Sequence, residues 1–253
     1  MNILGIDVGG SGIKGALVNI ETGEMVTKRF RIPTPPSRKP EEMAKVVAQI
    51  VAHFNYKGPI GCGFPTIIKN GICGSQGNLH KKWLGVKVDE LFSKATGLPV
   101  TVINDADAAG SAAINYGVGK GVKGFILMIT IGTGLGSGAF LDGRLIPNFE
   151  LGQIPYKKYK KIELWAAASA KEREQLSYKE WGKRFNKFLS YVELILAPDL
   201  IIIGGGTSKK WKEFKEEITI KTSVVPASLM NQAGIIGAAV ACTKYIEQKT
   251  KQL

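Results

Sequence analysis

Three glycine-rich turns, each directly after an apolar strand-like run, constrain this 253-residue chain more than any other feature. The turns are Gly9-Gly10-Ser11-Gly12, Gly132-Thr133-Gly134 and Gly204-Gly205-Gly206-Thr207. Glycine places no Cβ in front of the backbone, so successive N–H groups can converge on an anion. A single turn of this kind is equally well explained as a hairpin. Three of them, all after apolar strands, predict a protein that binds phosphate groups.

The residues around the turns narrow the kind of site. The second turn lacks the surrounding βαβ unit of a dinucleotide fingerprint and the Gly-Lys-Ser/Thr ending of a P-loop. The third turn precedes a helix predicted near residues 208–217, whose first amides would also favour an anion. Asp7 stands just before the first turn. Because a carboxylate approaches phosphate only at high cost, we expect Asp7 to hold Mg²⁺ through water.

Both halves of the chain open in the same way. Strands are predicted over residues 2–7, 13–19 and 24–32 around the first turn, and over residues 125–131 and 135–141 around the second. Helix–strand units follow in each half. This repetition predicts a duplicated α/β architecture of two lobes with a cleft between them.

Composition bounds the class of protein. The chain is 44% hydrophobic and has no apolar run of the length, roughly 18 residues, that a membrane helix needs. Its first residues, MNILGIDVGG, do not resemble a signal peptide. Three scattered cysteines, Cys62, Cys73 and Cys242, do not form a disulfide framework. We therefore expect a cytoplasmic protein that does not enter membranes.

The charge is high, with 34 basic residues against 21 acidic ones and a net charge of +13. Such a balance favours a polyanionic partner, and a generally basic proteome is the competing explanation. Ten basic residues lie between positions 157 and 187: Lys157, Lys158, Lys160, Lys161, Lys171, Arg173, Lys179, Lys183, Arg184 and Lys187. A second group, Lys209, Lys210, Lys212 and Lys215, follows the third turn. No recognition helix or aromatic–basic interleave favours nucleic acid. A phosphate polymer and a merely solvated basic face both stay open.

The order of the three turns resembles the actin/hexokinase-like ATPases. More narrowly, the chain is similar to the ROK family of sugar kinases and repressors, and within it to the polyphosphate glucokinases. The similar segments are IDVGGSGIKGALV (6–18), GFP (63–65), GNLHKKW (77–83), NDADAAG (104–110), TIGTGLGS (130–137), PNFELG (147–152), AAASAKEREQLSYKEW (166–181), PDLIIIGGGTSKK (198–210) and NQAGIIGAA (231–239). Segments 166–181 and 204–210 are those that point to the polyphosphate branch.

This resemblance implies a ribonuclease H-like duplicated fold. We expect a smaller N-terminal lobe, residues 1–105 plus about 237–253, and a larger C-terminal lobe, residues 106–236. The resemblance also implies the residues that bind the phosphoryl donor: Asp7, Gly9, Gly10, Ser11, Gly12, Lys14, Thr133, Gly134, Gly204, Gly205, Gly206 and Thr207.

The resemblance assigns the sugar side to Asn78, Asn104, Asp105 and Glu150. Asp105 would accept the proton of the attacking 6-hydroxyl, since phosphoryl transfer needs a carboxylate to align the nucleophile. Asn104-Asp105 after a strand could equally cap the following helix, and the two roles compete only in part.

Position 153 departs from the family pattern. The family usually reads Glu-Leu-Gly-His where this chain reads Glu150-Leu151-Gly152-Gln153. Gln153 can donate and accept, so a hydrogen bond to a sugar hydroxyl survives, but the choice of sugar stays open. Residues 154–177 contain no Cys or His, so we expect no structural zinc.

These features together predict a polyphosphate-dependent glucokinase with Mg²⁺ as cofactor. It would phosphorylate glucose from inorganic polyphosphate, ATP or both, and would form a homodimer. The alternatives are an ATP-dependent glucokinase or mannokinase of the same family and a non-catalytic sugar sensor. A repressor would need a DNA-binding domain before the first turn, and we expect none and no nucleic acid partner.

Overall fold

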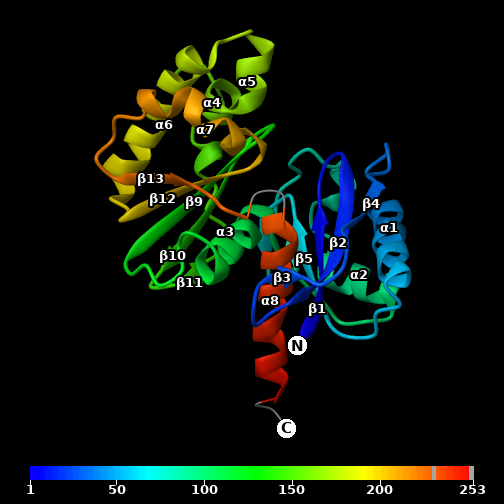
Figure 1. Cartoon of the computed structure of the whole chain (residues 1–253). Coiled ribbons are helices and arrows are strands. Elements are labelled where there is room, and N and C mark those ends of the chain that lie inside the picture. The colour runs from blue at the N-terminus through cyan, green and yellow to red at the C-terminus, as the bar shows by residue number, and fades with distance from the viewer. Residues whose placement is uncertain (230–231, 251–253) are drawn as a thin grey trace. The chain divides into compact units, whose positions relative to one another are not determined.

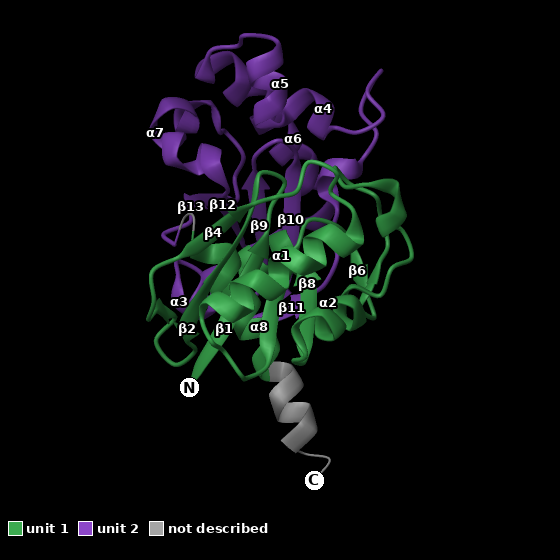
Figure 2. Ribbon diagram, turned by 90° about the vertical axis from the view of Figure 1, so that its right-hand side faces the viewer, with its two compact units in different colours: residues 1–112, 232–253 green, residues 113–231 purple. Residues whose placement is uncertain are grey.

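The computed structural model describes residues 1–229 and 232–250, with side chains up to residue 243. The chain forms two compact units, which are coloured separately in Figure 2. Unit 1 comprises residues 1–112 and 232–253, and unit 2 comprises residues 113–231.

Unit 1 contains a six-stranded sheet, with a two-stranded sheet and helices beside it (Figure 1). Its elements are β1 (Asn2–Val8), β2 (Gly12–Asn19), β3 (Glu24–Met25), β4 (Phe30–Pro33), α1 (Pro40–His53), β5 (Ile60–Phe64), β6 (Ile68–Lys69), β7 (Ile72–Cys73), η1 (Lys81–Trp83), α2 (Val88–Thr96), β8 (Val100–Asn104), α3 (Asp105–Tyr116) and α8 (Ala233–Thr250). The unit boundary falls within α3.

Unit 2 contains a five-stranded sheet and several short helices around one long one. Its elements are β9 (Phe125–Ile131), β10 (Leu135–Leu141), β11 (Arg144–Ile146), η2 (Leu151–Gln153), α4 (Glu163–Ala166), α5 (Ala168–Arg173), α6 (Tyr178–Leu196), β12 (Leu200–Gly204), η3 (Gly206–Lys210), α7 (Trp211–Phe214), η4 (Lys215–Glu217) and β13 (Ser223–Pro226).

The two sheets repeat one topology. The strand order is β3-β2-β1-β5-β8 in unit 1 and β11-β10-β9-β12-β13 in unit 2. In each unit the first two long strands form an antiparallel hairpin, and two later strands extend the sheet parallel to the first strand. These are β5 and β8 in unit 1 and β12 and β13 in unit 2. The predicted duplicated α/β fold is therefore confirmed.

Close backbone contact fixes α8 in unit 1. A Cβ on Gly61 of β5 would meet the carbonyl of Ala238, and one on Gly237 would meet the carbonyl of Ala108. Glycine is required at both positions because no side chain fits between the backbones. These contacts join α8 to the central strand β5 and to α3.

Unit 2 is organised around α6. Ser177 and Glu180 form a reciprocal capping box that fixes where the helix begins. The helix then buries Trp181, Phe185 and Phe188 in the hydrophobic core of the unit. The Trp181 indole N–H donates to the carbonyl of Ala166 at 2.9 Å, so the segment before α6 is fastened to its core face.

Three details differ from the sequence predictions. The strand predicted over residues 24–32 is two strands, β3 and β4, because each pairs with a different part of β2. The helix predicted near residues 208–217 is three short pieces, η3, α7 and η4. The unit boundaries lie at 112/113 and 231/232 rather than 105/106 and 236/237, and unit 1 is the larger unit, because it also includes the first part of α3 and the start of α8, which packs on β1 and β5. Residues 251–253 of the predicted first lobe lie outside the described residues.

Candidate active site

One edge of the unit 1 sheet gathers the first glycine turn and the predicted base. Strands β1, β5 and β8 are parallel neighbours, with Asp7 opposite Gly63 and Phe64 opposite Asn104. Ligands of such sheets bind beyond the carboxyl ends of the parallel strands. Asp105 follows β8 at the same edge at which the first turn follows β1.

The backbone of the first turn is held by hydrogen bonds, and its tip is accessible to an incoming group. The Gly9 N–H donates to the Gly12 carbonyl at 3.1 Å, and the Thr34 hydroxyl donates to the Gly9 carbonyl at 2.6 Å. No atom lies within 4 Å of where a Cβ on Gly10 would stand. Gly10 and Ser11 are exposed. The turn is thus held from behind while its tip stays accessible.

Asp7 and Lys14 lie just below the turn. Lys14 Nζ lies 3.3 Å from Asp7 Oδ2, and both side chains are partly exposed. A Cβ on Gly234 would stand 3.0 Å from Asp7 Cγ, so the carboxylate lies against the first turn of α8. The positive end of that helix favours a negative charge there.

Asn104 is the residue that caps α3. Its Oδ1 accepts from the N–H groups of Ala106 at 2.7 Å and Asp107 at 3.2 Å. Its Nδ2 donates to the Thr66 carbonyl at 3.1 Å, and the side chain is buried. The capping role is therefore taken by Asn104. Asp105 is the first residue of α3 and is partly exposed.

Asn78 lies in the loop before η1 and is exposed. Its backbone carbonyl accepts a hydrogen bond from Arg38 Nη1 at 2.7 Å. Trp83, which ends η1, is fully buried and donates to the Arg38 carbonyl at 2.8 Å. Arg38 therefore ties the loop that carries Asn78 to the connector after β4.

In unit 2 the second and third glycine turns are neighbours. Strands β9 and β12 are parallel, with Gly204 opposite Thr130, so both turns follow at the same sheet edge. Gly205 has φ +79°, and a Cβ there would meet the backbone of Ile131. This close approach needs glycine. The parallel pairing of β9 and β12 places the predicted residues Thr133, Gly134, Gly204, Gly205, Gly206 and Thr207 at one edge of the sheet.

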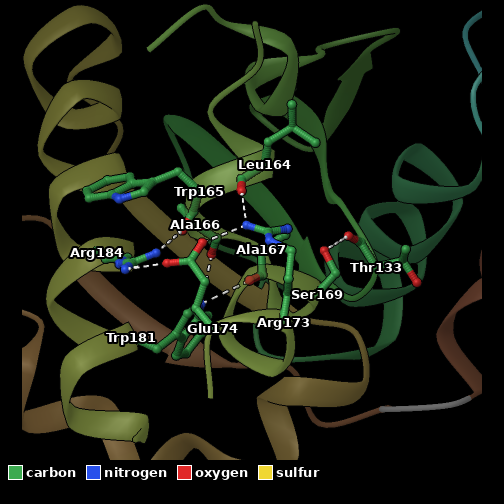
Figure 3. A network of polar contacts seen from close by, with 10 residues as sticks. All are labelled: Thr133, Leu164, Trp165, Ala166, Ala167, Ser169, Arg173, Glu174, Trp181 and Arg184. Carbon is green, nitrogen blue, oxygen red and sulfur yellow. Dashed lines mark hydrogen bonds and ion pairs between the residues drawn. The ribbon is translucent and has the colours of Figure 1, made fainter. Parts of the chain in front are cut away.

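One short helix, α5, holds the second turn from outside the sheet. The N–H of Ala168 donates to the Gly132 carbonyl at 3.1 Å, and the Ser169 hydroxyl donates to the Thr133 carbonyl at 2.6 Å. Figure 3 shows this second contact beside the polar network of the same segment. The turn's carbonyls are thereby drawn toward α5, while Gly132 and Thr133 themselves are exposed.

Figure 3 also shows how α5 is anchored. Glu174 pairs with Arg173 and with Arg184 of α6, each at 2.7 Å. Arg173 also donates to the Leu164 carbonyl at 2.7 Å. Hydrogen bonds from Arg184 and Arg173 hold the pKa of the Glu174 carboxyl below its usual value. The network links α4, α5 and α6 into one support for the second turn.

Glu163 was not among the residues predicted from the sequence, and it contacts one of them, Gln153, together with the residue that follows the second turn. Its Oε2 accepts from the Leu135 N–H, directly after the second turn, at 3.2 Å. Its Oε1 accepts from Gln153 Nε2 at 3.2 Å, and Lys161 Nζ lies 3.6 Å from that oxygen. One carboxylate thus connects the end of the second glycine turn with a predicted sugar residue. Glu163 lies before the similar segment 166–181, and nothing in the sequence singles it out.

The hydrogen bond to Glu163 fixes the orientation of the Gln153 side-chain amide. A carboxylate only accepts hydrogen bonds, so Gln153 must turn its NH₂ toward Glu163 and leave its carbonyl oxygen on the other side. The neighbouring Glu150 loop is docked by Ser137, whose hydroxyl donates to the Phe149 carbonyl at 2.7 Å and accepts from the Leu151 N–H at 2.9 Å. The segment 150–153 is therefore held at the start of β10.

The cysteines do not contribute a reactive group. Cys62, Cys73 and Cys242 are free and buried. Burial raises the pKa of the Cys242 thiol to about 11, and burial together with the Asp7 charge raises that of Cys62 still further. Within the described part of the chain, no group of three His, Cys, Asp or Glu residues could hold a metal ion.

The basic residues of unit 2 are mostly exposed and partly engaged. Lys157 and Lys158 lie over the rings of Tyr156 and Tyr159. Lys210 pairs with Glu213 at 2.8 Å. After the third turn the chain forms the five-residue η3 rather than a long helix, so the predicted dipole contribution at this turn is absent.

The comparisons with known proteins identify the class. Residues 3–148 match the model of the ROK family, and the chain belongs to that family. It is 41% identical to a polyphosphate glucokinase of Mycobacterium tuberculosis, over 94% of this chain and 89% of that protein. A polyphosphate glucokinase of Mycobacterium leprae is 38% identical, over 94% of this chain and 74% of that protein.

Comparison with solved structures also finds sugar kinases. The inorganic polyphosphate/ATP-glucomannokinase of Arthrobacter sp. strain KM has a TM-score of 0.92 and 43% identity, over 96% of this chain and 99% of that one. A ROK family glucokinase of Streptomyces griseus has a TM-score of 0.82 at 21% identity, over 96% of this chain and 100% of that one, and supports the fold alone. No helix within the described residues is long and apolar enough to cross a membrane.

Proposed function

We propose that this protein is a sugar kinase that transfers a phosphoryl group from inorganic polyphosphate to the 6-hydroxyl of glucose. The observation that carries the proposal is the shared sheet edge in unit 1, where Asp105 follows β8 and the first glycine turn follows β1. A carboxylate beside a phosphate-binding turn is what phosphoryl transfer to a hydroxyl requires. The relatives that are named polyphosphate glucokinases supply the expected donor and sugar.

In the proposed reaction Asp105 accepts the proton of the 6-hydroxyl. The hydroxyl oxygen attacks the terminal phosphorus, and the bond from that phosphorus to the bridging oxygen of the next phosphate breaks. The products are glucose 6-phosphate and a polyphosphate shorter by one unit. Asn104 is rigid because its amide caps α3 and bonds Thr66, so it can orient the sugar with little loss of entropy.

We propose donor-binding residues at the glycine turns of each unit. Gly9, Gly10, Ser11, Gly12 and Lys14 are proposed on unit 1, and Thr133, Gly134, Gly204, Gly205, Gly206 and Thr207 on unit 2. Mg²⁺ needs only one or two protein carboxylates when phosphates and waters complete its shell, and the partly exposed Asp7 fits that need. Bound there, the ion would neutralise charge on the transferred group.

On the sugar side we propose Asn78, Glu150 and Gln153 as further contacts. With its NH₂ directed to Glu163, Gln153 would accept a hydrogen bond from a sugar hydroxyl through its carbonyl oxygen. A cytoplasmic location and a homodimer, both expected from the sequence, complete the proposal.

A second candidate is a kinase that uses ATP or accepts mannose as well. The name of the Arthrobacter protein, a polyphosphate/ATP-glucomannokinase, favours it. A non-catalytic sugar sensor is the third reading, motivated by Gln153 in place of the family histidine.

The test is an assay of glucose and mannose phosphorylation with long-chain polyphosphate and with ATP as separate donors. We expect glucose 6-phosphate from polyphosphate. Turnover with ATP alone would establish the second candidate, and binding of glucose without turnover on either donor would establish the sensor.

A further inference from the structure

Three charged side chains form a row across the unit 1 sheet beside the first glycine turn. Asp7 of β1 is opposite Lys14 of β2, and Lys14 is opposite Arg31 of β4. Directly opposed residues of antiparallel strands project from the same face. The row therefore reads acid, base, base across three neighbouring strands.

Arg31 contacts the first turn itself. Its Nη2 donates to the Ser11 carbonyl at 2.6 Å. The guanidinium also fills the space that a Cβ on Gly12 would take. A guanidinium has five N–H donors, and Ser11 occupies one of them. The remaining donors lie beside a turn whose tip is open.

The row has one positive charge too many. Lys14 pairs with Asp7, but Arg31 forms no ion pair with any carboxylate in the described part of the chain. Like charges placed directly opposite on neighbouring strands destabilise a sheet. An anion bound between the turn and Arg31 would remove that repulsion, and a guanidinium binds phosphate oxygens in a bidentate manner that lysine does not reproduce.

We propose that Arg31 is a donor-binding residue that contacts a phosphate of the phosphoanhydride chain held at the first glycine turn. The identity of the chain as phosphoryl donor rests on the proposed function, whereas the anion site rests on the row of charges. The same chemistry is offered by inorganic polyphosphate and by the triphosphate of ATP, so the experiment uses both.

The test measures equilibrium binding without sugar, so that no turnover is needed. Tripolyphosphate and Mg²⁺-ATP are titrated calorimetrically into wild type, Arg31→Ala, Arg31→Lys and Arg144→Ala. Arg144 is the matched control because it is exposed and begins β11, at the end of β10 away from the second turn.

We expect Arg31→Ala to weaken tripolyphosphate binding about tenfold or more, because a charge-assisted contact is lost. The slope of log Kd against log salt should fall by about one, as expected when one phosphate contact is removed. Arg31→Lys should keep the salt slope but bind more weakly than wild type, and Arg144→Ala should match wild type. Equal losses for both ligands would place Arg31 at a phosphate that both share, and a loss confined to tripolyphosphate would place it where only the polymer continues.

An Arg31 that merely braces Ser11 would lower thermal stability in Arg31→Ala and leave the salt slope unchanged, which would overturn the proposal. The proposal would also be overturned if the wild-type protein bound neither tripolyphosphate nor Mg²⁺-ATP. Wild type that binds tripolyphosphate but does not phosphorylate glucose would reject the proposed function and leave the comparison of Arg31 variants valid.

Discussion

The two units share a strand order, but they hold their glycine turns differently. In unit 1 the first turn is fastened by Thr34 and Arg31, from the edge strand β4 and the residue just after it. In unit 2 the second turn is fastened by Ala168, Ser169 and Glu163, from helices outside the sheet. The repeated sheet supplies two edges with glycine turns, and the surroundings of each edge make the units different.

This difference predicts that the two units contribute to different steps of the reaction. In unit 1 Asp7 and the first turn stand at the end of the central strand β1, and Asp105 follows the outer strand β8; both strands pack against α8, which restricts their movement. In unit 2 the position of the turn depends on side-chain contacts at its outer face, among them the Glu163 link to Gln153. Loss of the Asp105 carboxylate in unit 1 should therefore affect the chemical step, and changes in the unit 2 support should affect affinity for donor and sugar together.

The largest expected effect tests the unit 1 side of this comparison. Asp105→Asn should lower kcat about 10²- to 10⁴-fold, because the proton acceptor is lost while the shape is kept. Asp142→Asn is the control. Asp142 lies in the β10–β11 turn, and Asn keeps the Oδ1 that accepts a hydrogen bond from the Gly124 N–H. Turnover of Asp105→Asn within about tenfold of wild type would remove Asp105 from the role of base.

The next effect tests the unit 2 support. Glu163→Ala should raise KM for glucose and KM for the donor together, each about tenfold, because both of its hydrogen bonds are lost. Gln153→Ala should raise KM for glucose and leave donor affinity unchanged. In the double variant the two effects on glucose should fall short of their sum, since they remove the same contact. Strict additivity would separate Gln153 from Glu163.

The orientation of Gln153 can be tested by substitution of the side chain that faces Glu163. Gln153→Glu would set two carboxylates against each other across the present 3.2 Å contact and should lose glucose affinity more than Gln153→Ala. Gln153→His can still donate to Glu163 and should stay near wild type. Steady-state KM for glucose at fixed donor measures both. Equal behaviour of the Glu and His variants would mean that Glu163 does not set the orientation of residue 153.

A smaller effect concerns the basic loop before α4. Neutralisation of Lys157, Lys158, Lys160 and Lys161 to Gln should raise KM for long polyphosphate more than KM for ATP, and should flatten its salt dependence. Single changes should be weak, because exposed charges contribute little one by one. The control neutralises four exposed lysines of unit 1, Lys45, Lys57, Lys69 and Lys94. Equal salt slopes for the two donors in wild type would leave the loop as a solvated surface.

The sequence predicted the fold and the family because both depend on local patterns. Glycine turns after apolar strands, repeated in each half, gave the strand pairs that the structure contains. The site assignments themselves stay predictions. The prediction of one strand over residues 24–32 was wrong. A continuous stretch of sequence does not show that its two ends pair with different parts of β2.

The contacts of Glu163 and Arg31 were not predictable from the sequence, for a physical reason. Each reaches a turn through residues distant along the chain, Arg31 to Ser11 and Glu163 to Leu135. A charged residue on an exposed strand or a short helix carries no signature in its own neighbourhood. Only the register of β2 with β4, and the approach of α4 to β10, assigns these side chains a partner.

The smallest effect tests how far the α5 network supports the second turn. Arg184 and Arg173 lower the pKa of Glu174 from its ordinary value of 4.5. A lowered pKa means that the contribution to stability is present above the ordinary value and is lost as the pH falls through the lowered one. Because these side chains are partly exposed, Glu174→Gln should reduce Tm at pH 7 by no more than about 3 °C. The difference in Tm between wild type and variant should shrink as the pH is lowered below 4.5. Hydrogen exchange should rise in residues 163–174 and around the second turn, while β1 and β5 of unit 1 stay as protected as in wild type. Faster exchange in β1 and β5 would mean that the two turns are not held independently, and the contrast between the units would fail at that point.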